Sequence, residues 1–262
     1  MAAKRSIASY GVAFLIILAL NFFLPRLMPG DPLTAIYGDE ALIAMTPELK
    51  AQLVERFALD KSLWEQFGAY FQGLFQGDLG YSYSYNAPVL RVILGHLPWT
   101  MLLVGSSLVF STVLGIVLGI ESGWRRGSKT DRALLVGMMS LNGFPDFFLG
   151  MVFLLIFGVT LGVCPLAGAL TPYSKLSGVP LVLDVIQHLA LPVMALTIAH
   201  LASGYLLTRN TMITVLKEPF MLTARAKGLS QRALKYRHAG RNSMLPVITM
   251  IGIWSGRLVT GA

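Results

Sequence analysis

The 262-residue sequence is poor in charged side chains and has a single cysteine. Asp, Glu, Lys and Arg make up 13% of the chain and hydrophobic residues 55%, whereas soluble globular domains carry about 25% charged residues. The lone Cys164 excludes an intrachain disulfide and a metal site built from several cysteines. Long apolar runs approach or exceed the about 20 residues that a helix needs to cross a bilayer. The composition therefore predicts a polytopic membrane protein.

Motifs for nucleotide binding and for hydrolysis are also missing. The nearest match to a phosphate-binding loop, G-S-K-T from Gly127 to Thr130, lacks a glycine directly before its lysine and follows an apolar run. His200 and Asp146 lie on different apolar runs with no accompanying nucleophile motif, which argues against a membrane-embedded hydrolase. No basic stripe with interleaved aromatics indicates nucleic acid. We therefore expect no catalytic residues, cofactor, metal or nucleic-acid partner.

Five apolar segments predict membrane spans, at about 7–25, 98–120, 133–162, 188–208 and 246–262. The third contains N-G-F-P-D, Asn142 to Asp146, whose glycine and proline should kink or break the helix. The last span runs from Val247 for 16 residues, which reach about 24 Å as a helix. Because the hydrocarbon core is about 30 Å thick, we expect that further chain follows this span.

Lys and Arg are distributed unevenly between alternate connections. The connection 26–97 has more acidic than basic residues, and 163–187 has one lysine, whereas 209–245 is strongly basic. Basic residues favour the cytoplasmic side of a membrane. We therefore expect a multi-pass protein of the inner (cytoplasmic) membrane with a cytoplasmic N-terminus, an outer loop over 26–97 and a cytoplasmic loop over 209–245.

The outer loop carries signals for ordered helices. Thr46 before Pro47 and Glu48 is typical of a helix start with proline at the first position. Ser62 and Glu65 have the spacing of a capping box, and aromatic residues follow at helical spacing. Two compatible interpretations fit this segment: a helix lying at the outer membrane interface, or a platform for an extracytoplasmic partner.

The basic loop over 209–245 predicts a helical hairpin. Pro219 suits the first turn of a short helix that ends at Gly228, and Ser230 suits the cap of a second helix over Gln231–Ala239. On the first helix we expect three residues to share one face: Phe220, Met221 and Ala224. Attraction to anionic lipid, worth about 1 kcal/mol per basic residue, would explain the charge but not the fixed turns and alanines. A protein-docking helix explains both.

Motifs along nearly the whole chain resemble the dipeptide/oligopeptide class of ABC importer permeases. The strongest are T-A-R-A-K-G-L-S from Thr223 and R-H-A-G-R-N-S-M-L-P-V from Arg237. Others follow in the same order as in that class: P-G-D-P (Pro29 to Pro32), L-D-K-S-L-W-E-Q-F (Leu59 to Phe67), G-D-L-G-Y-S (Gly77 to Ser82), R-R-G-S-K-T-D-R (Arg125 to Arg132), F-P-D-F-F-L-G (Phe144 to Gly150) and L-T-R-N-T-M (Leu207 to Met212).

The resemblance implies one transmembrane permease domain over 1–262, with the all-α bundle of the type I ABC-importer fold. It implies four further partners besides membrane lipid: a second homologous permease, two cytoplasmic ABC ATPases and an extracytoplasmic substrate-binding protein. The ATPases would power alternating access for a peptide or a related small solute. The cargo stays open among dipeptides, oligopeptides, nickel complexes, glutathione and oligosaccharides.

By the same resemblance, the basic loop corresponds to the ATPase-coupling region. Its expected coupling residues are Phe220, Met221, Thr223, Ala224, Arg225, Ala226, Lys227 and Gly228. The sequence departs from the broader importer pattern, because Leu222-Thr223-Ala224 replaces Glu-Ala-Ala. Gly240 stands where the peptide subclass more often has a bulkier residue, so the end of the second helix is not defined by the motif.

Three ionisable residues in the apolar runs are candidates for the translocation pathway. Asp146 either lines the pathway or satisfies backbone N–H groups freed by the break beside it. His200 is better suited to packing and hydrogen bonding between helices than to binding a metal. Arg257 either lines the pathway or pairs with Asp146. An ion-coupled secondary transporter is the alternative function, but it would require inverted repeats and more intramembrane carboxylates than Asp146 alone.

Overall fold

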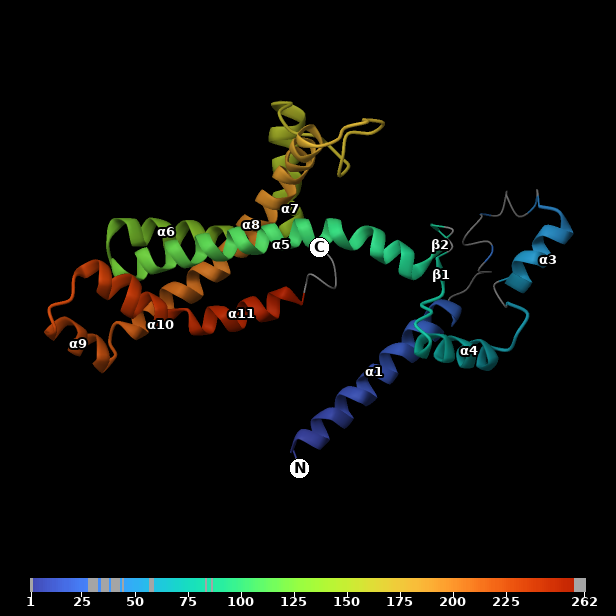
Figure 1. Cartoon of the computed structure of the whole chain (residues 1–262), viewed down its shortest axis with the longest axis horizontal. Helices are drawn as coiled ribbons and strands as arrows, with labels where there is room; N and C mark the ends of the chain where they lie inside the picture. The colour runs from blue at the N-terminus through green and yellow to red at the C-terminus, as the bar shows by residue number, and fades with distance from the viewer. Residues whose placement is uncertain are drawn as a thin grey trace. The chain divides into compact units, whose positions relative to one another are not determined.

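The computed structural model of the chain is almost entirely helical. It describes residues 2–27, 33, 38, 43, 45–56, 59–82, 84–85 and 87–256. Within these residues the strands are the two-residue β1 (Tyr81–Ser82) and β2 (Ala87–Pro88), which pair antiparallel (Figure 1). The predicted all-α fold is therefore confirmed. The chain forms two compact units, Met1–Gly95 and His96–Ala262.

Figure 1 labels the α-helices, and the two π-helical segments stand between them in chain order. They are α1 (Ala2–Leu27), α3 (Pro47–Arg56), α4 (Leu63–Phe75), α5 (Val89–Trp124), α6 (Lys129–Leu141), α7 (Asp146–Phe153), the π-helical η1 (Leu154–Thr160), α8 (Val179–Val215), α9 (Pro219–Ala226), the π-helical η2 (Ala233–Gly240), α10 (Arg241–Ser243) and α11 (Leu245–Ser255).

In the first unit, α4 is capped as the sequence predicts. The Ser62 hydroxyl accepts from the Glu65 backbone N–H at 3.3 Å and donates to the Glu65 carboxylate at 2.8 Å. The hydrogen bonds that the Ser62 hydroxyl and the Ser62 N–H donate to this carboxylate hold the pKa of Glu65 below its ordinary value. The aromatic face of α4 packs on the end of α1: Phe22 lies 5.2 Å from Phe67 and 5.4 Å from Tyr70 between ring centroids.

Three helices are long and apolar enough to cross a membrane by themselves. They are the stretch Ser9–Leu27 of α1, all of α5 and all of α8. These contain the predicted spans at 98–120 and 188–208 and most of the span at 7–25, although α5 and α8, with 36 and 37 residues, extend well beyond the predictions. The predicted span at 246–262 begins within α11, and its residues after 256 lie outside the described part of the chain.

The predicted break in the third apolar segment is confirmed. Helix α6 ends at Leu141, α7 begins at Asp146, and the two axes differ by 97°. Pro145 explains the restart, because its extended backbone stands directly before the first turn of α7 and its missing N–H needs no helical partner. If α6 and α7–η1 form one bent span, the described residues hold up to four spans.

Helices α5 and α8 approach each other closely along a row of glycines. A Cβ built on Gly119 would lie 2.6 Å from Thr208 Cβ, and one on Gly123 would lie 2.8 Å from Met212 Cβ. At Gly115 the same atom would lie 3.2 Å from the Gly204 carbonyl carbon. Glycines spaced by four residues let helix backbones approach in a membrane, where packing replaces the hydrophobic driving force. This row sets the distance between the two long helices of the second unit.

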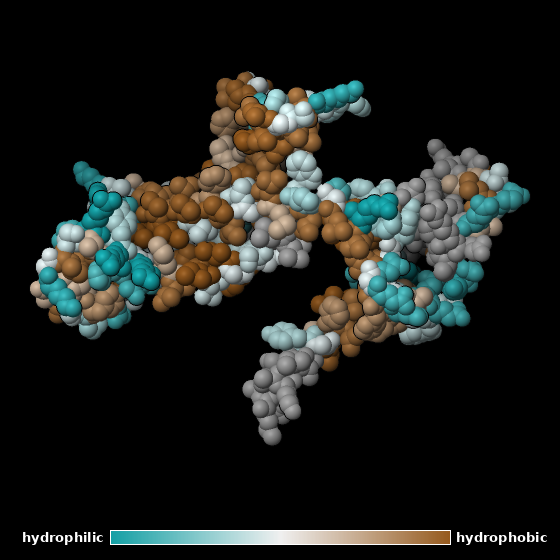
Figure 2. Space-filling view, in the orientation of Figure 1, coloured by the Kyte–Doolittle hydropathy of each residue, from teal (hydrophilic) through white to brown (hydrophobic). Residues whose placement is uncertain are grey.

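Two apolar cores flank that interface. One contains Met138 of α6 and Leu201, Ala202 and Tyr205 of α8. The other lies at the ends of α5 and α8, beneath α9 and η2. Figure 2 shows an apolar surface over α6 and the adjoining part of α5, whereas polar residues gather over α9. The predicted hairpin therefore lies at a polar end of the second unit.

Candidate functional site

Helix α9 forms where the sequence predicts a short helix between proline and glycine. Glu218 precedes it in an extended conformation, and Pro219 occupies the first turn, where a missing N–H costs no helical hydrogen bond. After Lys227, Gly228 adopts φ +71°, a left-handed conformation that ends a helix cheaply only at glycine. The local signals thus define both ends of the helix.

The face of α9 expected to dock on a partner is largely turned inward. Met221 and Ala224 are only 1% and 5% exposed, whereas Leu222 on the opposite side is 72% exposed. Thr223 and the segment 225–228 are also exposed, and Phe220 lies at the margin. Of the three residues expected to share one face, Met221 and Ala224 therefore pack against this chain, whereas Phe220 is partly exposed; the coupling role of these residues stays a prediction.

The inward face belongs to the core at the ends of the two long helices. Met221 and Ala224 pack in one buried cluster with Ile120 of α5 and with Met212 and Val215 of α8. Leu234 and Ala239 complete this cluster from the following helix. Small side chains at 224 and 239 allow the short helices to approach the long ones. The hairpin is consequently seated on the helical body instead of projecting as a free loop.

The second helix of the hairpin continues further than predicted. The Ser230 hydroxyl accepts from the Ala233 N–H at 3.3 Å, as expected of the cap. Helical structure does not end at Ala239 but runs through η2 and α10 to Ser243. Gly240 allows this course, because a Cβ there would lie 3.0 Å from both Ile120 Cδ1 and the Lys235 carbonyl oxygen. A bulkier residue would push η2 away from α5.

A charged contact fastens η2 to α5. The Lys235 ammonium group and the Tyr236 hydroxyl both hydrogen-bond Oε1 of Glu121, while Arg125 lies 3.8 Å from the other carboxylate oxygen. The Lys235 side chain is almost buried. Lys235 and Tyr236 lie more than 110 positions after Glu121 in the sequence, so these two hydrogen bonds join the hairpin to the last turn of α5.

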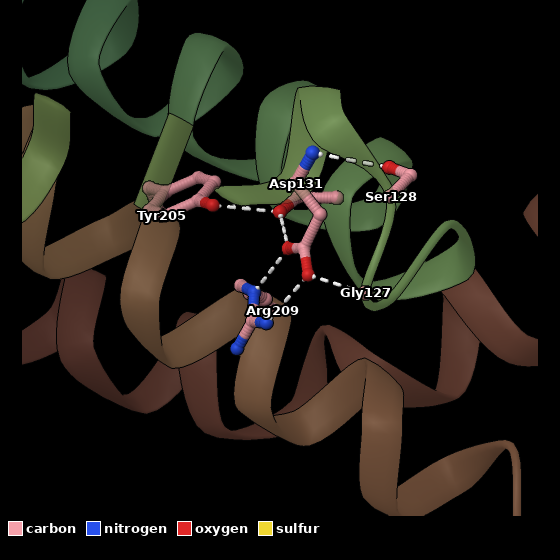
Figure 3. Close-up of polar contacts among 6 residues, drawn as sticks. Gly127, Ser128, Asp131, Tyr205 and Arg209 are labelled. Carbon is pink, nitrogen blue, oxygen red and sulfur yellow. Dashed lines mark hydrogen bonds and ion pairs between the residues drawn. The ribbon is translucent and has the colours of Figure 1, made fainter. Parts of the chain in front are cut away.

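A buried polar network, which the sequence did not reveal, lies beside this contact (Figure 3). Asp131 of α6 is 2% exposed and receives two hydrogen bonds from Arg209 of α8, Nε to Oδ1 at 2.6 Å and Nη2 to Oδ2 at 2.8 Å. Ser122 of α5 hydrogen-bonds Oδ1 of the same carboxylate and, at 2.6 Å, the Tyr205 hydroxyl of α8. Three helices therefore meet at one carboxylate.

The turn between α5 and α6 is folded around the same carboxylate. The Gly127 N–H donates to Oδ2 of Asp131 at 2.8 Å, and Gly127 has φ +84°. The Ser128 hydroxyl accepts from the Asp131 N–H at 3.1 Å and so caps α6 (Figure 3). The one sequence signal for this arrangement is an aspartate three residues after a serine cap, among four basic residues. Its partner on α8 is 78 positions away.

Two of the three pathway candidates, Asp146 and His200, lie in the described part of the chain. Asp146 is exposed at the first residue of α7, and among the described residues its carboxylate has no hydrogen-bond or ion-pair partner. The His200 Nδ1 lies 2.7 Å from the Leu196 carbonyl oxygen, and its ring packs edge-on to Trp254 of α11 at 5.4 Å. Arg257 lies outside the described residues, so its two expected roles, lining the pathway or pairing with Asp146, stay predictions.

Comparison with known proteins defines the class of this helical chain. The profile of the family described as "Binding-protein-dependent transport system inner membrane component" matches residues 111–262. The profile of its N-terminal membrane component matches residues 2–104. The chain therefore belongs to the binding-protein-dependent transport system inner membrane components, and the resemblance to the dipeptide/oligopeptide class of importer permeases is confirmed.

Individual relatives are similar over most of their length. A di/tripeptide transport system permease of Pseudomonas aeruginosa is 33% identical over 257 residues, covering 93% of this chain and 76% of that protein. A dipeptide transport system permease of Escherichia coli K12 is 32% identical over 266 residues, covering 95% and 78%. A glutathione transport system permease of Escherichia coli O6:H1 is 34% identical over 251 residues, covering 94% and 75%.

Proposed function

We propose that this chain is the permease subunit of an ATP-driven importer for peptides, in which the hairpin of α9 and η2 receives the movement of a partner ATPase. The chain itself supplies helices and a docking surface, and ATP hydrolysis belongs to the partner. The observation that carries the proposal is the seated hairpin: its inner face is packed on α5 and α8, while its outer face presents exposed basic and apolar groups.

The outer face defines the expected contact with the ATPase. Leu222 and Phe220 provide apolar surface, and Arg225 and Lys227 place positive charge beside it. A hollow over η2 is lined by Ser230, Arg232, Ala233, Tyr236 and Arg237. A partner groove with an apolar floor and acidic rim would complement this surface, because opposite charges guide docking and exclude wrong partners.

Attraction to anionic lipid is the competing explanation for the basic charge. A lipid-binding segment requires positive charge near the surface but no particular side-chain register. In α9 the register is specified by the burial of Met221 and Ala224, and both ends of the helix are specified by proline and glycine. Such fixed geometry favours a protein partner, since a shaped groove discriminates between positions on one helix.

The complete assembly follows from this proposal. A second homologous permease, two cytoplasmic ATPases and an extracytoplasmic binding protein would join the chain, whose N-terminus lies in the cytoplasm. Residues 1–262 act as one permease domain, and loop 26–97 faces the binding protein. Peptides are the proposed cargo because the named relatives carry dipeptides, di- and tripeptides or glutathione, which is itself a small peptide.

Charge reversal on the outer face tests the docking site. We expect the double variant Arg225→Glu and Lys227→Glu to lose at least about tenfold of the co-purifying ATPase, because both changes place like charge against an acidic groove. Both residues are exposed, so the melting temperature of the purified permease should stay within about 2 °C of wild type.

The matched control is Arg126→Glu, an exposed basic residue on the turn between α5 and α6. It should leave ATPase recovery unchanged, whereas a lipid-attraction effect would respond to all of these charges alike. Full ATPase recovery by the Arg225→Glu and Lys227→Glu variant would contradict the docking site. Uptake that persists without any ATPase, driven by an ion gradient, would instead support a secondary transporter.

A further inference from the structure

The last turn of α5 is held from two sides by neighbouring residues. Glu121 binds Lys235 and Tyr236 of the hairpin, and Ser122, one position later, joins the polar network around Asp131. Consecutive helical residues point about 100° apart, because the helix has 3.6 residues per turn. If the hairpin moves, Glu121 passes the movement to α5. Ser122, on the adjacent side of α5, connects the same helix to the network.

The hydrogen bonds of the network have preferred directions, unlike the apolar contacts around them. Arg209 donates to both carboxylate oxygens of Asp131, and this bidentate arrangement defines orientation as well as distance. Ser122 bridges that carboxylate to Tyr205, so α5, α6 and α8 share one set of bonds. The neighbouring core of Met138, Leu201 and Ala202 is apolar, and apolar attraction has no preferred direction.

Stability alone is a poor reason for an ion pair at this depth. The side chains of Asp131 and Arg209 are 3% and 11% exposed, and removing two charges from water costs free energy that their attraction repays only partly. Well-packed apolar residues of similar volume often stabilise such a position as well or better. We therefore look for the function of the pair in the orientation that it imposes on the helices, because apolar side chains would not impose it.

We propose that Asp131 and Arg209, with Ser122 and Tyr205, are positioning residues that make the meeting ends of α5, α6 and α8 move as one body with the hairpin. This inference rests on the proposed function, because the hairpin must first receive movement from an ATPase. With the network intact, displacement of α9 and η2 is passed to all three helices. Without it, α5 and α8, on which the hairpin packs, follow the hairpin while α6 lags, and ATP is hydrolysed without transport.

The experiment uses the complete transporter, with ATPase, second permease and binding protein, in proteoliposomes. The variants are Asp131→Asn, Arg209→Gln and the two together, and Arg132→Gln is the matched control because Arg132 is the exposed basic neighbour of Asp131. Three quantities are measured for each: melting temperature, amount of bound ATPase, and ATP hydrolysed per molecule of dipeptide taken up.

Each single variant leaves one buried charge without its partner and should lower the melting temperature. The double variant removes both charges and should recover most of that loss. We expect its ATPase binding to equal wild type. ATP hydrolysed per dipeptide should rise about tenfold, because a typical coupling free energy between two sites corresponds to a change of that size. A purely structural pair predicts the opposite: restored stability would restore the ATP-to-dipeptide ratio, and that result would overturn the proposal.

A milder variant decides the matter if the double variant fails to fold. Tyr205→Phe keeps the buried ring and removes only the hydroxyl that hydrogen-bonds Ser122. Its ATP-to-dipeptide ratio should rise about threefold, because the free energy of one neutral hydrogen bond corresponds to a change of that size. An unchanged ratio in a folded Tyr205→Phe transporter would overturn the inference. A wild-type permease that binds no ATPase would contradict the proposed function itself, and that result is visible before any variant is tested.

Discussion

Replacing Gly119 with valine is expected to force apart the two long helices of the second unit. Even the first added carbon would lie 2.6 Å from Thr208 Cβ and 3.0 Å from the Tyr205 carbonyl oxygen, both of which belong to the body of α8. A Cβ and a carbonyl oxygen are fixed by the α8 backbone and cannot yield as a flexible side-chain end can, so α5 and α8 must separate. Overpacking of this kind costs about 3 kcal/mol of folding stability.

The measurement is the melting temperature and the fraction of monodisperse protein in detergent. Gly137→Val is the matched control, because Gly137 lies on α6 with no heavy atom within 4 Å of an added Cβ. Glycine and valine are both weak helix formers, so this control should remain close to wild type. Equal melting temperatures for the two variants would mean that α5 and α8 are not in close contact at Gly119.

Aspartate placed at two positions of α9 is expected to produce opposite defects. Ala224→Asp puts a carboxylate into the cluster with Ile120 and Met212, at a cost on the order of 3 kcal/mol, because that cluster is made of apolar side chains. The hairpin should detach from α5 and α8. Leu222→Asp changes the exposed side of the same helix and should leave the fold intact while abolishing ATPase binding.

Limited proteolysis distinguishes the two defects. Cleavage after the basic residues within the range 225–241 should accelerate at least about tenfold in Ala224→Asp. The population of locally opened hairpin increases as packing free energy is lost. In Leu222→Asp the cleavage rate should match wild type, while ATPase recovery falls. Wild-type protease resistance with lost ATPase binding in Ala224→Asp would show that Ala224, and not Leu222, faces the partner.

Local signals were sufficient to predict most helix positions in this chain. Apolar runs place α1, α5 and α8, and Pro145 places the break between α6 and α7. The capping box at Ser62 and the Pro219–Gly228 boundaries were equally readable, because each depends on a few adjacent residues. Structure determined by nearby residues was therefore accessible from the sequence.

The orientation of α9 was not accessible in the same way. A short helix with apolar residues on one side packs equally well on its own chain or on a partner, and periodicity does not distinguish the two. Only the contacts of Met221 and Ala224 with α5 and α8 decide the matter. The same contacts explain why a bulky charged residue at Ala224 is expected to disrupt the hairpin itself.

The polar network escaped prediction for a related reason. Asp131 lies among basic residues whose distribution indicates only the orientation in the membrane, and its partner Arg209 lies 78 positions along the chain. No local pattern links the two. The glycine row did carry a signal, because Gly115, Gly119 and Gly123 recur every four residues in an apolar helix, a spacing typical of close helix packing.

Site-specific cross-linking from Leu222 tests the central claim most directly. In a Cys164→Ser background, Leu222→Cys and the control Arg126→Cys present exposed thiols on α9 and on the turn between α5 and α6. The account predicts that a short thiol-reactive cross-linker joins the first variant, and not the second, to the ATPase in membranes. Labelling of Leu222→Cys in intact cells by a membrane-impermeant maleimide, with no ATPase cross-link, would contradict it.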